Sequence, residues 1–334
     1  MQRQLTFGGG VSPRGTLLRG QSVIEYVLII AVIGLVIVFA GPGVAGAIRN
    51  QFNLVGNTVN SGTTGGAEGG ASGGGSTGAD SATVQAAIAK DAKDWTLDEQ
   101  KAVAADIAAK GEASPAYAKA KAAMDAETKW TIKLTNGQTM QYRIIGIDHD
   151  DLADGSGKAG LTFLTTSTGI KSRVNATDTN AGGWEMSELR TKMNSGEIWN
   201  LMPSDFQSKV KPVRKLTNNV GGDGANKNAA VTATSDKLFL LSNAEIVPTS
   251  SWATSSWTSL YPWTSNEGTQ YEAFKGKVTE YDGPNSAIAN GNEWWERTVY
   301  PYDSTSFLYV HRNGLPSPGF FATGSDCVCP AWCF

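Results

Sequence analysis

Residues 130–166 decide the fold of the C-terminal part, and they read WTIKLTNGQTMQYRIIGIDHDDLADGSGKAGLTFLTT. Three apolar or alternating runs, at 130–134, 141–147 and 161–166, are separated by Asn-Gly, Asp-Gly and Gly-Lys pairs. Alternation with a period of two is typical of β-strands, and these dipeptides are turn signals. The stretch therefore predicts a domain that opens with strands joined by hairpins.

The sequence that follows mixes helical and strand patterns. Helical spacing is found at 187–194 and 203–210, and the apolar run KLFLLS at 237–242 is typical of one buried strand. The stretches 214–236 and 247–292 are rich in Gly, Asn, Ser and Trp, and we expect them to form long irregular loops. The predicted fold class is α+β.

The residues before this domain predict short helices. Thr96-Leu-Asp-Glu99 has the pattern of a capping box, Gly111 is a helix stop, and Ser114-Pro115 is typical of a helix start. Because this Ala-rich region carries few large apolar side chains, we expect residues 82–127 to be a helical spacer without catalytic groups. Before it, residues 51–81 are dominated by Gly, Ser and Thr, which predicts a flexible linker.

The N-terminal region contains an apolar run at 23–48 that is long enough to cross a bilayer and has one acidic residue, Glu25, near its start. The preceding residues 1–20 contain Arg3, Arg14 and Arg19 and no acidic residue. This asymmetry predicts that the leader stays cytoplasmic and that the rest of the chain is exported.

The motif RGQSVIEYVLII at 19–30 resembles the processing site of type IV pilins, especially the Flp and class III signal types. The resemblance implies a leader of residues 1–20, cleavage by a prepilin peptidase between Gly20 and Gln21, and a transmembrane and assembly helix at 21–50. Glu25, followed by Tyr26, would pair with the N-terminal amine of a neighbouring pilin subunit. The chain would then be membrane-anchored before assembly and later displayed on the cell surface or in an extracellular pilus. A plain signal anchor is the alternative.

Composition argues against several functional classes. The formal net charge is −3 and Lys and Arg form no long run, so nucleic acid is not an expected partner. With two histidines and no Gly-x-Ser-x-Gly or His-Glu-x-x-His motif, we expect no enzyme, no catalytic residue and no cofactor. Asp148-His149-Asp150-Asp151 is interpreted as a solvated turn in preference to a metal site, because neighbouring strand side chains point to opposite faces.

All three cysteines, Cys327, Cys329 and Cys333, lie within the last eight residues. No disulfide framework can therefore stabilise the main body of the protein. Two of them could form a disulfide, or all three could be buried thiols; a metal site is the less favoured interpretation.

Several ordered motifs resemble a bacterial domain family of unknown function with a C-type-lectin-like fold. They are WEMSELRTKMNSGEIWNLMP (184–203), KLFLLSNAEI (237–246), YEAF (271–274), NEWWERT (292–298) and VCPAWCF (328–334). The resemblance covers residues 128–334. The same fold is found in formylglycine-generating enzymes and in the variable proteins of diversity-generating retroelements, so fold alone does not choose the function.

A compositional gap favours the second of these relatives. Between Val299 and Ala331 the chain contains no Lys, Glu, Gln, Met or Trp, although both flanks contain some of them. A retroelement randomises adenines in its template, and an Asn codon with a pyrimidine in third place cannot become any of those five residues. Residues 299–331 are therefore predicted to be a variable region, whereas a fixed loop pair that closes the fold is the alternative.

The variable region predicts the ligand-binding surface. Phe307, Leu308 and Val310 are expected in a buried strand, with Trp294 and Trp295 as scaffold. The residues expected to face the ligand are Tyr300, Tyr302, Asp303, Ser306, Tyr309, His311, Arg312, Leu315, Ser317, Phe320, Phe321 and Ser325. This mixture of aromatic and small polar residues is typical of antibody paratopes.

The expected function is a pilin-like adhesin or receptor-binding protein whose lectin-like surface is diversified. Its ligand would be an unknown protein or glycan on a host, phage or neighbouring cell. The alternatives are a pilin with a fixed adhesin head and a surface enzyme of the formylglycine-generating type, which would need a redox-active cysteine pair.

Overall fold

The computed structural model describes residues 81–334 apart from 168, 219–230, 249–265, 301–302 and 317. All described residues belong to one compact unit, Ser72–Phe334. The predicted leader, membrane helix and linker at 1–20, 21–50 and 51–81 lie outside the described residues, except for Ser81.

The first described elements are the helices α3 (Ser81–Ala89), α4 (Leu97–Lys110) and α5 (Tyr117–Asp125), with single 3-10 turns η1 (Ala92–Asp94) and η2 (Gly111–Ala113) between them. The predicted capping box is confirmed, because the Thr96 side chain accepts a bond from the Glu99 amide and the Glu99 carboxylate accepts one from the Thr96 amide at 2.7 Å. Gly111 ends α4 with a φ of 58°. The third helix begins at Tyr117 with Ala116 as its N-cap, two residues later than the start predicted from Ser114-Pro115, and the Ser114 hydroxyl accepts from the Ala116 amide at 3.2 Å.

A four-stranded antiparallel sheet follows, in the order β1-β2-β3-β11. It is formed by β1 (Lys129–Lys133), β2 (Thr139–Ile147), β3 (Leu161–Ser167) and the C-terminal β11 (Ala331–Cys333). The three strands predicted from the alternation are confirmed. The last strand of the chain pairs with β3, so the two ends of the domain are joined in one sheet.

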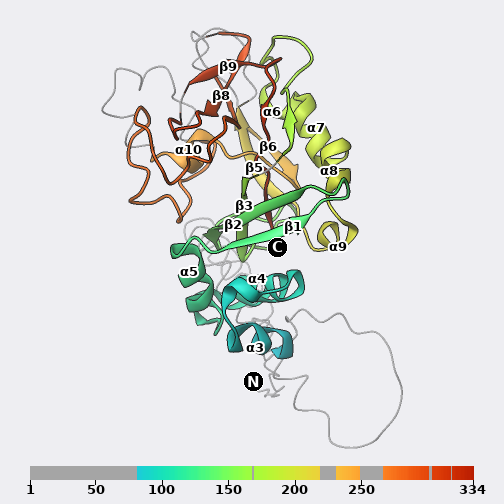
Figure 1. The fold of residues 1–334 in the computed structure, drawn as a ribbon, viewed down its shortest axis with the longest axis vertical. Coiled ribbons are helices and arrows are strands. Elements are labelled where there is room, and N and C mark those ends of the chain that lie inside the picture. Colours follow the sequence, from blue (N-terminus) through green and yellow to red (C-terminus); the bar gives the residue numbers. More distant parts are fainter. Residues whose placement is uncertain (1–80, 168, 219–230, 249–265, 301–302, 317) are drawn as a thin grey trace, which may run out of the picture. The chain divides into compact units, whose positions relative to one another are not determined.

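Helices α4 and α5 pack directly on this sheet, and α3 packs against α4 (Figure 1). The Trp95 and Trp130 rings stack with centroids 6.2 Å apart, and Trp130 Nε1 donates to the Ala92 carbonyl at 2.9 Å. Tyr142 of β2 donates to Gln100 of α4 at 3.1 Å. Residues 82–127 were expected to be a spacer; in the structure their buried side chains belong to the same hydrophobic core as those of the sheet.

A second sheet has the order β4-β10-β7-β8-β9. Its strands are β4 (Lys171–Ser172), β10 (Asp326–Cys327), β7 (Trp294–Val299), β8 (Ser306–Val310) and β9 (Gly319–Phe321). The chain between β4 and the second half of the domain forms α6 (Gly183–Met186), α7 (Glu188–Asn194), α8 (Glu197–Leu201) and α9 (Ser204–Gln207). The helix predicted at 187–194 is confirmed as α7 with Ser187 as its N-cap, whereas the one predicted at 203–210 is a single turn.

The centre of the domain differs from the sequence prediction in two places. Residues 214–236 were predicted to be irregular, but β5 (Val213–Asn218) and β6 (Val231–Asp236) form an antiparallel hairpin. The buried strand predicted at 237–242 is wrong: this run is buried and makes one isolated bridge, Phe239 to Ala331, before α10 (Asn243–Ile246). Beyond that bridge the run forms no strand ladder: Leu240 O accepts from the Arg297 side chain at 2.8 Å, and Leu241 O accepts from the Arg297 amide at 2.9 Å.

The predicted fold class also needs correction. It included an N-terminal transmembrane helix, but no helix among the described residues is both long and apolar enough to span a bilayer. The described residues form a mixed helix-and-sheet domain.

Candidate functional site

Aromatic side chains from three adjacent strands gather on one surface of the second sheet. Trp295 of β7 lies opposite Tyr309 of β8, and Phe307 of β8 lies opposite Phe320 of β9. Because side chains two residues apart on a strand share a face, the register places Trp295, Tyr309 and Phe320 on the same side of the sheet. We call Trp295, Tyr309, His311 and Phe320, together with Phe321, the next residue along the edge strand β9, the aromatic patch.

The patch is a continuous set of ring contacts. Phe320 lies 5.8 Å from Trp295 and 5.8 Å from Tyr309, measured between ring centroids, and 6.4 Å from Phe321. His311 lies 6.5 Å from Tyr309. Trp295 is fully buried beneath, whereas Phe320 is 38% and Phe321 55% exposed. The ring contacts therefore extend from the buried Trp295 to Phe320 and Phe321, which contact solvent.

Two carboxylates, those of Glu293 and Asp326, lie beside the aromatic patch. Glu293 Oε1 lies 3.4 Å from His311 Nε2, and Asp326 Oδ2 is buried without a hydrogen-bond partner. Burial, with the nearby charges of Glu293 and Asp326, raises the pKa of Tyr309, so its hydroxyl stays protonated at neutral pH. Burial and Glu293 also raise the pKa of Asp326. The patch thus offers apolar area together with hydrogen-bonding groups.

Glycines let two of the aromatic rings lie close to the backbone. A Cβ at Gly324 would stand 2.0 Å from the Phe320 ring, and one at Gly319 would stand 2.5 Å from the Tyr300 ring. No larger residue fits at either position without moving the ring. The position of Phe320 on the surface therefore depends on Gly324 as well as on the strand register.

The residues predicted to face the ligand are distributed unevenly. Tyr309, His311, Phe320 and Phe321 come together in the patch. Arg312 and Ser325 are exposed, and Tyr300, Asp303 and Leu315 are half-buried. Tyr302 and Ser317 lie outside the described residues.

Ser306, which we expected to face the ligand, is buried, and its hydroxyl donates to Asp303 Oδ2 at 3.1 Å. We therefore leave it out of the surface. Phe307, Leu308 and Val310 are fully buried in β8, as predicted.

Sequence reasoning missed Asn180, which holds the backbone beside the patch. Its side-chain amide is fully buried and donates to the carbonyls of Asp303 at 2.9 Å and Ser306 at 3.0 Å. Asn180 lies more than 120 positions before these residues, so no local pattern indicates the contact. Its amide donors satisfy carbonyls that a loop alone leaves unpaired.

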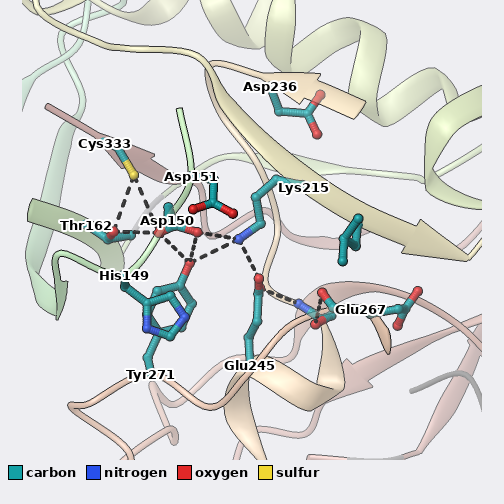
Figure 2. Close-up of polar contacts among 12 residues, drawn as sticks. His149, Asp150, Asp151, Thr162, Lys215, Asp236, Glu245, Glu267, Tyr271 and Cys333 are labelled. Atoms are coloured by element: carbon teal, nitrogen blue, oxygen red, sulfur yellow. Dashed lines mark hydrogen bonds and ion pairs between the residues drawn. The ribbon is translucent and has the colours of Figure 1, made fainter. Parts of the chain in front are cut away.

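A buried ion network lies in the interior of the domain (Figure 2). Lys215 of β5 stands between two carboxylates: its Nζ lies 2.7 Å from Asp150 Oδ1 and also pairs with Glu245 of α10. Glu245 in turn binds Arg297 of β7, with Oε1 3.0 Å from Nη2. The network consists of Asp150, Lys215, Glu245 and Arg297, all of them buried.

Neutral donors complete the network at Asp150. Tyr271 donates to Asp150 Oδ2 at 2.9 Å and Thr162 donates to the same oxygen at 2.6 Å, with the Cys333 thiol 3.6 Å away (Figure 2). Burial opposes ionisation, but Lys215 outweighs it and lowers the pKa of Asp150. Asp150 was predicted to lie in a solvated turn; Asp148 and Asp151 are exposed, whereas Asp150 points into the core.

This network has the properties of a scaffold. It joins the end of β2 to β5, α10 and β7, and its members are paired with one another. Among the described residues, no group of three or more His, Cys, Asp and Glu side chains is arranged to hold a metal ion. The paired charges of Asp150, Lys215, Glu245 and Arg297 therefore fix the position of β7, one of the strands that carry the patch.

The three cysteines are buried free thiols. Burial raises the pKa of each of them. A raised pKa leaves little thiolate at neutral pH, so these groups are weak nucleophiles. The sequence left open a disulfide between two of the cysteines or three buried thiols, and the structure has three buried thiols.

The residues proposed for processing and assembly, Gly20, Gln21, Glu25 and Tyr26, lie outside the described residues. The fold and the site define a mixed helix-and-sheet domain that carries an exposed aromatic patch over a buried ion network.

Residues 159–334, more than half of the 334-residue chain, match the family described as a domain of unknown function, DUF6273. The chain belongs to that family. Comparison with curated proteins and with solved structures found no match, so it assigns no C-type-lectin-like fold to the chain.

Proposed function

We propose that the domain recognises a ligand without catalysis, and that the aromatic patch is the contact surface. The observation that carries this proposal is the pair Phe320 and Phe321, which are exposed on β9, with the Phe320 ring packed on the buried Trp295. Large aromatic side chains that are held rigid and in contact with water are typical anchors of binding interfaces.

The exposure of these rings is unusual within the domain. Among the described residues the exposed large hydrophobic side chains are Met186, Phe320 and Phe321. Fully burying an aromatic side chain contributes about 2 kcal/mol, and because Phe320 and Phe321 are 38% and 55% exposed, the pair together forgoes about 2 kcal/mol. A surface that keeps such a pair, with Tyr309 and His311 beside it, gains free energy when a partner covers it.

The buried thiols support recognition over the competing enzyme class. A formylglycine-generating mechanism needs reactive cysteines, whereas burial raises the pKa of Cys327, Cys329 and Cys333. The partner we propose is a protein or glycan on a host, phage or neighbouring cell. Display outside the cell is proposed from the N-terminal processing motif alone.

Substituting the two exposed rings tests the site. We expect Phe320→Ser with Phe321→Ser to weaken binding about 100-fold, because two anchor residues together contribute about 3 kcal/mol. The full chain is applied to protein and glycan arrays, and the dissociation constant is measured for each ligand captured. Met186→Ser is the matched control: Met186 is 73% exposed but lies outside the patch, and we expect binding within twofold of the unsubstituted chain. Equal binding by the double variant contradicts the proposal.

We also propose that the patch is diversified by a retroelement. The support is the absence of five residue types between Val299 and Ala331, together with the division of that segment into buried strand residues and exposed aromatic and polar ones.

Sequencing the last codons of the gene across many cells of one population tests the diversification. We expect substitutions at Tyr309, His311, Phe320 and Phe321 that match adenines in a nearby near-copy of the segment, and none at Phe307 or Leu308. An invariant segment without such a copy would leave a fixed adhesin surface and exclude diversification.

A further inference from the structure

A second candidate site lies on the first sheet. A cavity of about 370 Å³ is bounded by β1, β2 and β3 on one side and by the segment 286–290 on the other. We call it the Arg143 pocket, and the lining residues used below are Lys129, Gln141, Arg143, Thr165, Ser286 and Asn290. A volume of this size is at the lower end of the range for small-molecule sites.

Two cations stand side by side in the wall of this pocket. Lys129 of β1 and Arg143 of β2 are direct cross-strand partners, so both side chains emerge on the same face of the sheet. Like charges directly opposite each other destabilise a sheet. Lys129 is exposed and has neither an ion pair nor a hydrogen bond through its side chain within the described part of the chain.

Arg143 is buried and only partly satisfied. Its Nη2 donates to the Ala287 carbonyl at 2.8 Å, and Nη1 lies 3.0 Å from Glu127 Oε2, but Nε and Nη1 have no hydrogen bond of adequate geometry. A guanidinium that is 3% exposed normally has most of its donors bonded. Arg143 therefore retains donor capacity in the wall of a cavity.

The single carboxylate in the lining does not balance these charges. Glu127 is shared between Arg143 and Lys277, whose Nζ lies 2.9 Å from Glu127 Oε1. Burial would raise the pKa of Glu127, but Lys277 and Arg143 outweigh it and lower that pKa, so the carboxylate is charged. The lining thus contains two cations, Lys129 and Arg143, and one carboxylate that is already paired, so an anionic ligand can compensate the remaining positive charge.

The remaining lining combines polar groups with apolar and aromatic side chains. Gln141, Asn290 and Ser286 contribute amide and hydroxyl groups, and the Thr165 hydroxyl donates to the Pro330 carbonyl at 2.9 Å, which leaves its oxygen able to accept. Phe274 packs against the Arg143 guanidinium at 5.8 Å. These groups match a ligand with hydroxyl groups better than an apolar one.

We propose that the Arg143 pocket binds a small organic anion that carries a carboxylate and several hydroxyl groups, such as a sugar acid. The carboxylate would approach Lys129 and the Arg143 guanidinium, whose planar donor arrangement suits a carboxylate. The ligand hydroxyls would exchange hydrogen bonds with Gln141, Ser286 and Asn290. This site does not depend on the aromatic patch.

Titration of the full chain with glucuronate, followed by calorimetry, tests the site. Glucose is the matched neutral compound and inorganic phosphate the matched inorganic anion. We expect glucuronate to bind at least tenfold more tightly than glucose, and to bind more tightly than phosphate. We expect Lys129→Met to weaken glucuronate binding about tenfold, and Arg143→Gln to weaken it further.

Lys133→Met is the control, because Lys133 is exposed on the same strand and lies outside the pocket. Circular dichroism of each variant separates loss of binding from loss of folding, and Lys129→Met tests the site even where Arg143→Gln does not fold. Equal binding of glucuronate and glucose, binding of phosphate alone, or equal effects of Lys129→Met and Lys133→Met would each overturn the proposal. None of these outcomes changes the expectation for Phe320 and Phe321.

Discussion

Lys215→Met is expected to destabilise the domain by about 3–5 kcal/mol, the cost of removing one partner from a buried ion pair. Lys215 is fully buried and its Nζ contacts Asp150, Glu245 and the Tyr271 hydroxyl. Met has a similar volume, so packing is largely kept while both carboxylates lose a cation. Asp150 is affected most, because it is left with the neutral donors Tyr271 and Thr162, whereas Glu245 still pairs with Arg297. Urea denaturation followed by tryptophan fluorescence measures the difference.

The pH dependence follows from the pKa shifts. Burial opposes ionisation of Asp150 and Glu245, but Lys215 lowers the pKa of Asp150, and Arg297 with Lys215 lowers that of Glu245. This stabilisation is therefore present above about pH 4 and is lost as pH falls. Burial would lower the pKa of Lys215, but Asp150 and Glu245 raise it, so its contribution is present below about pH 10. The difference between the unsubstituted chain and Lys215→Met should therefore be largest near neutral pH.

An exposed lysine is the control for this experiment. Lys121 pairs with Asp125 at 2.7 Å, and both side chains are more than half exposed. Lys121→Met should leave the stability nearly unchanged, because exposed ion pairs contribute little. If Lys215→Met costs as little as Lys121→Met, the buried network does not stabilise the fold.

Gly160→Ala is expected to cost about 3 kcal/mol, because it forces apart the helices and the first sheet. A Cβ at Gly160 would stand 1.9 Å from the Ala104 carbonyl oxygen of α4 and 2.7 Å from its carbonyl carbon. Both are backbone atoms, so no side-chain rotation relieves the clash and a whole helix must shift. Overpacking of this kind costs 1–3 kcal/mol, and more where backbone must move. The denaturation midpoint and the fluorescence of Trp95 and Trp130 report the change.

Gly283→Ala is the matched control, since its nearest contact would be the flexible end of Glu280 at 3.4 Å. It should be neutral, or slightly stabilising because alanine has fewer unfolded conformations. A Gly160→Ala variant as stable as Gly283→Ala would mean that α4 does not pack against β3 as the structure has it. It would also restore the interpretation of residues 82–127 as an independent spacer.

The sequence by itself determined the local elements of this protein. Strands β1, β2 and β3 follow from alternation over 130–166, and the start of α4 follows from Thr96 and Glu99, because both patterns operate between residues a few positions apart. The burial of Phe307 and Val310 could be predicted for the same reason. Local steric and hydrogen-bonding rules were sufficient there.

Only the tertiary structure decided what happens to groups whose partners are distant in the chain. The run 237–242 has the apolar composition of a strand, yet beyond the Phe239–Ala331 bridge its carbonyls accept from the Arg297 side chain and amide and form no continuous strand ladder. Asp150 belongs to a polar turn by sequence but is buried against Lys215, 65 positions later. The helices at 81–125 cover the sheet because Trp95 and Ala104 meet Trp130 and Gly160. Hydrophobic burial and charge pairing act between surfaces that meet only when the chain has folded. Contacts of this kind therefore cannot be predicted from a local sequence pattern.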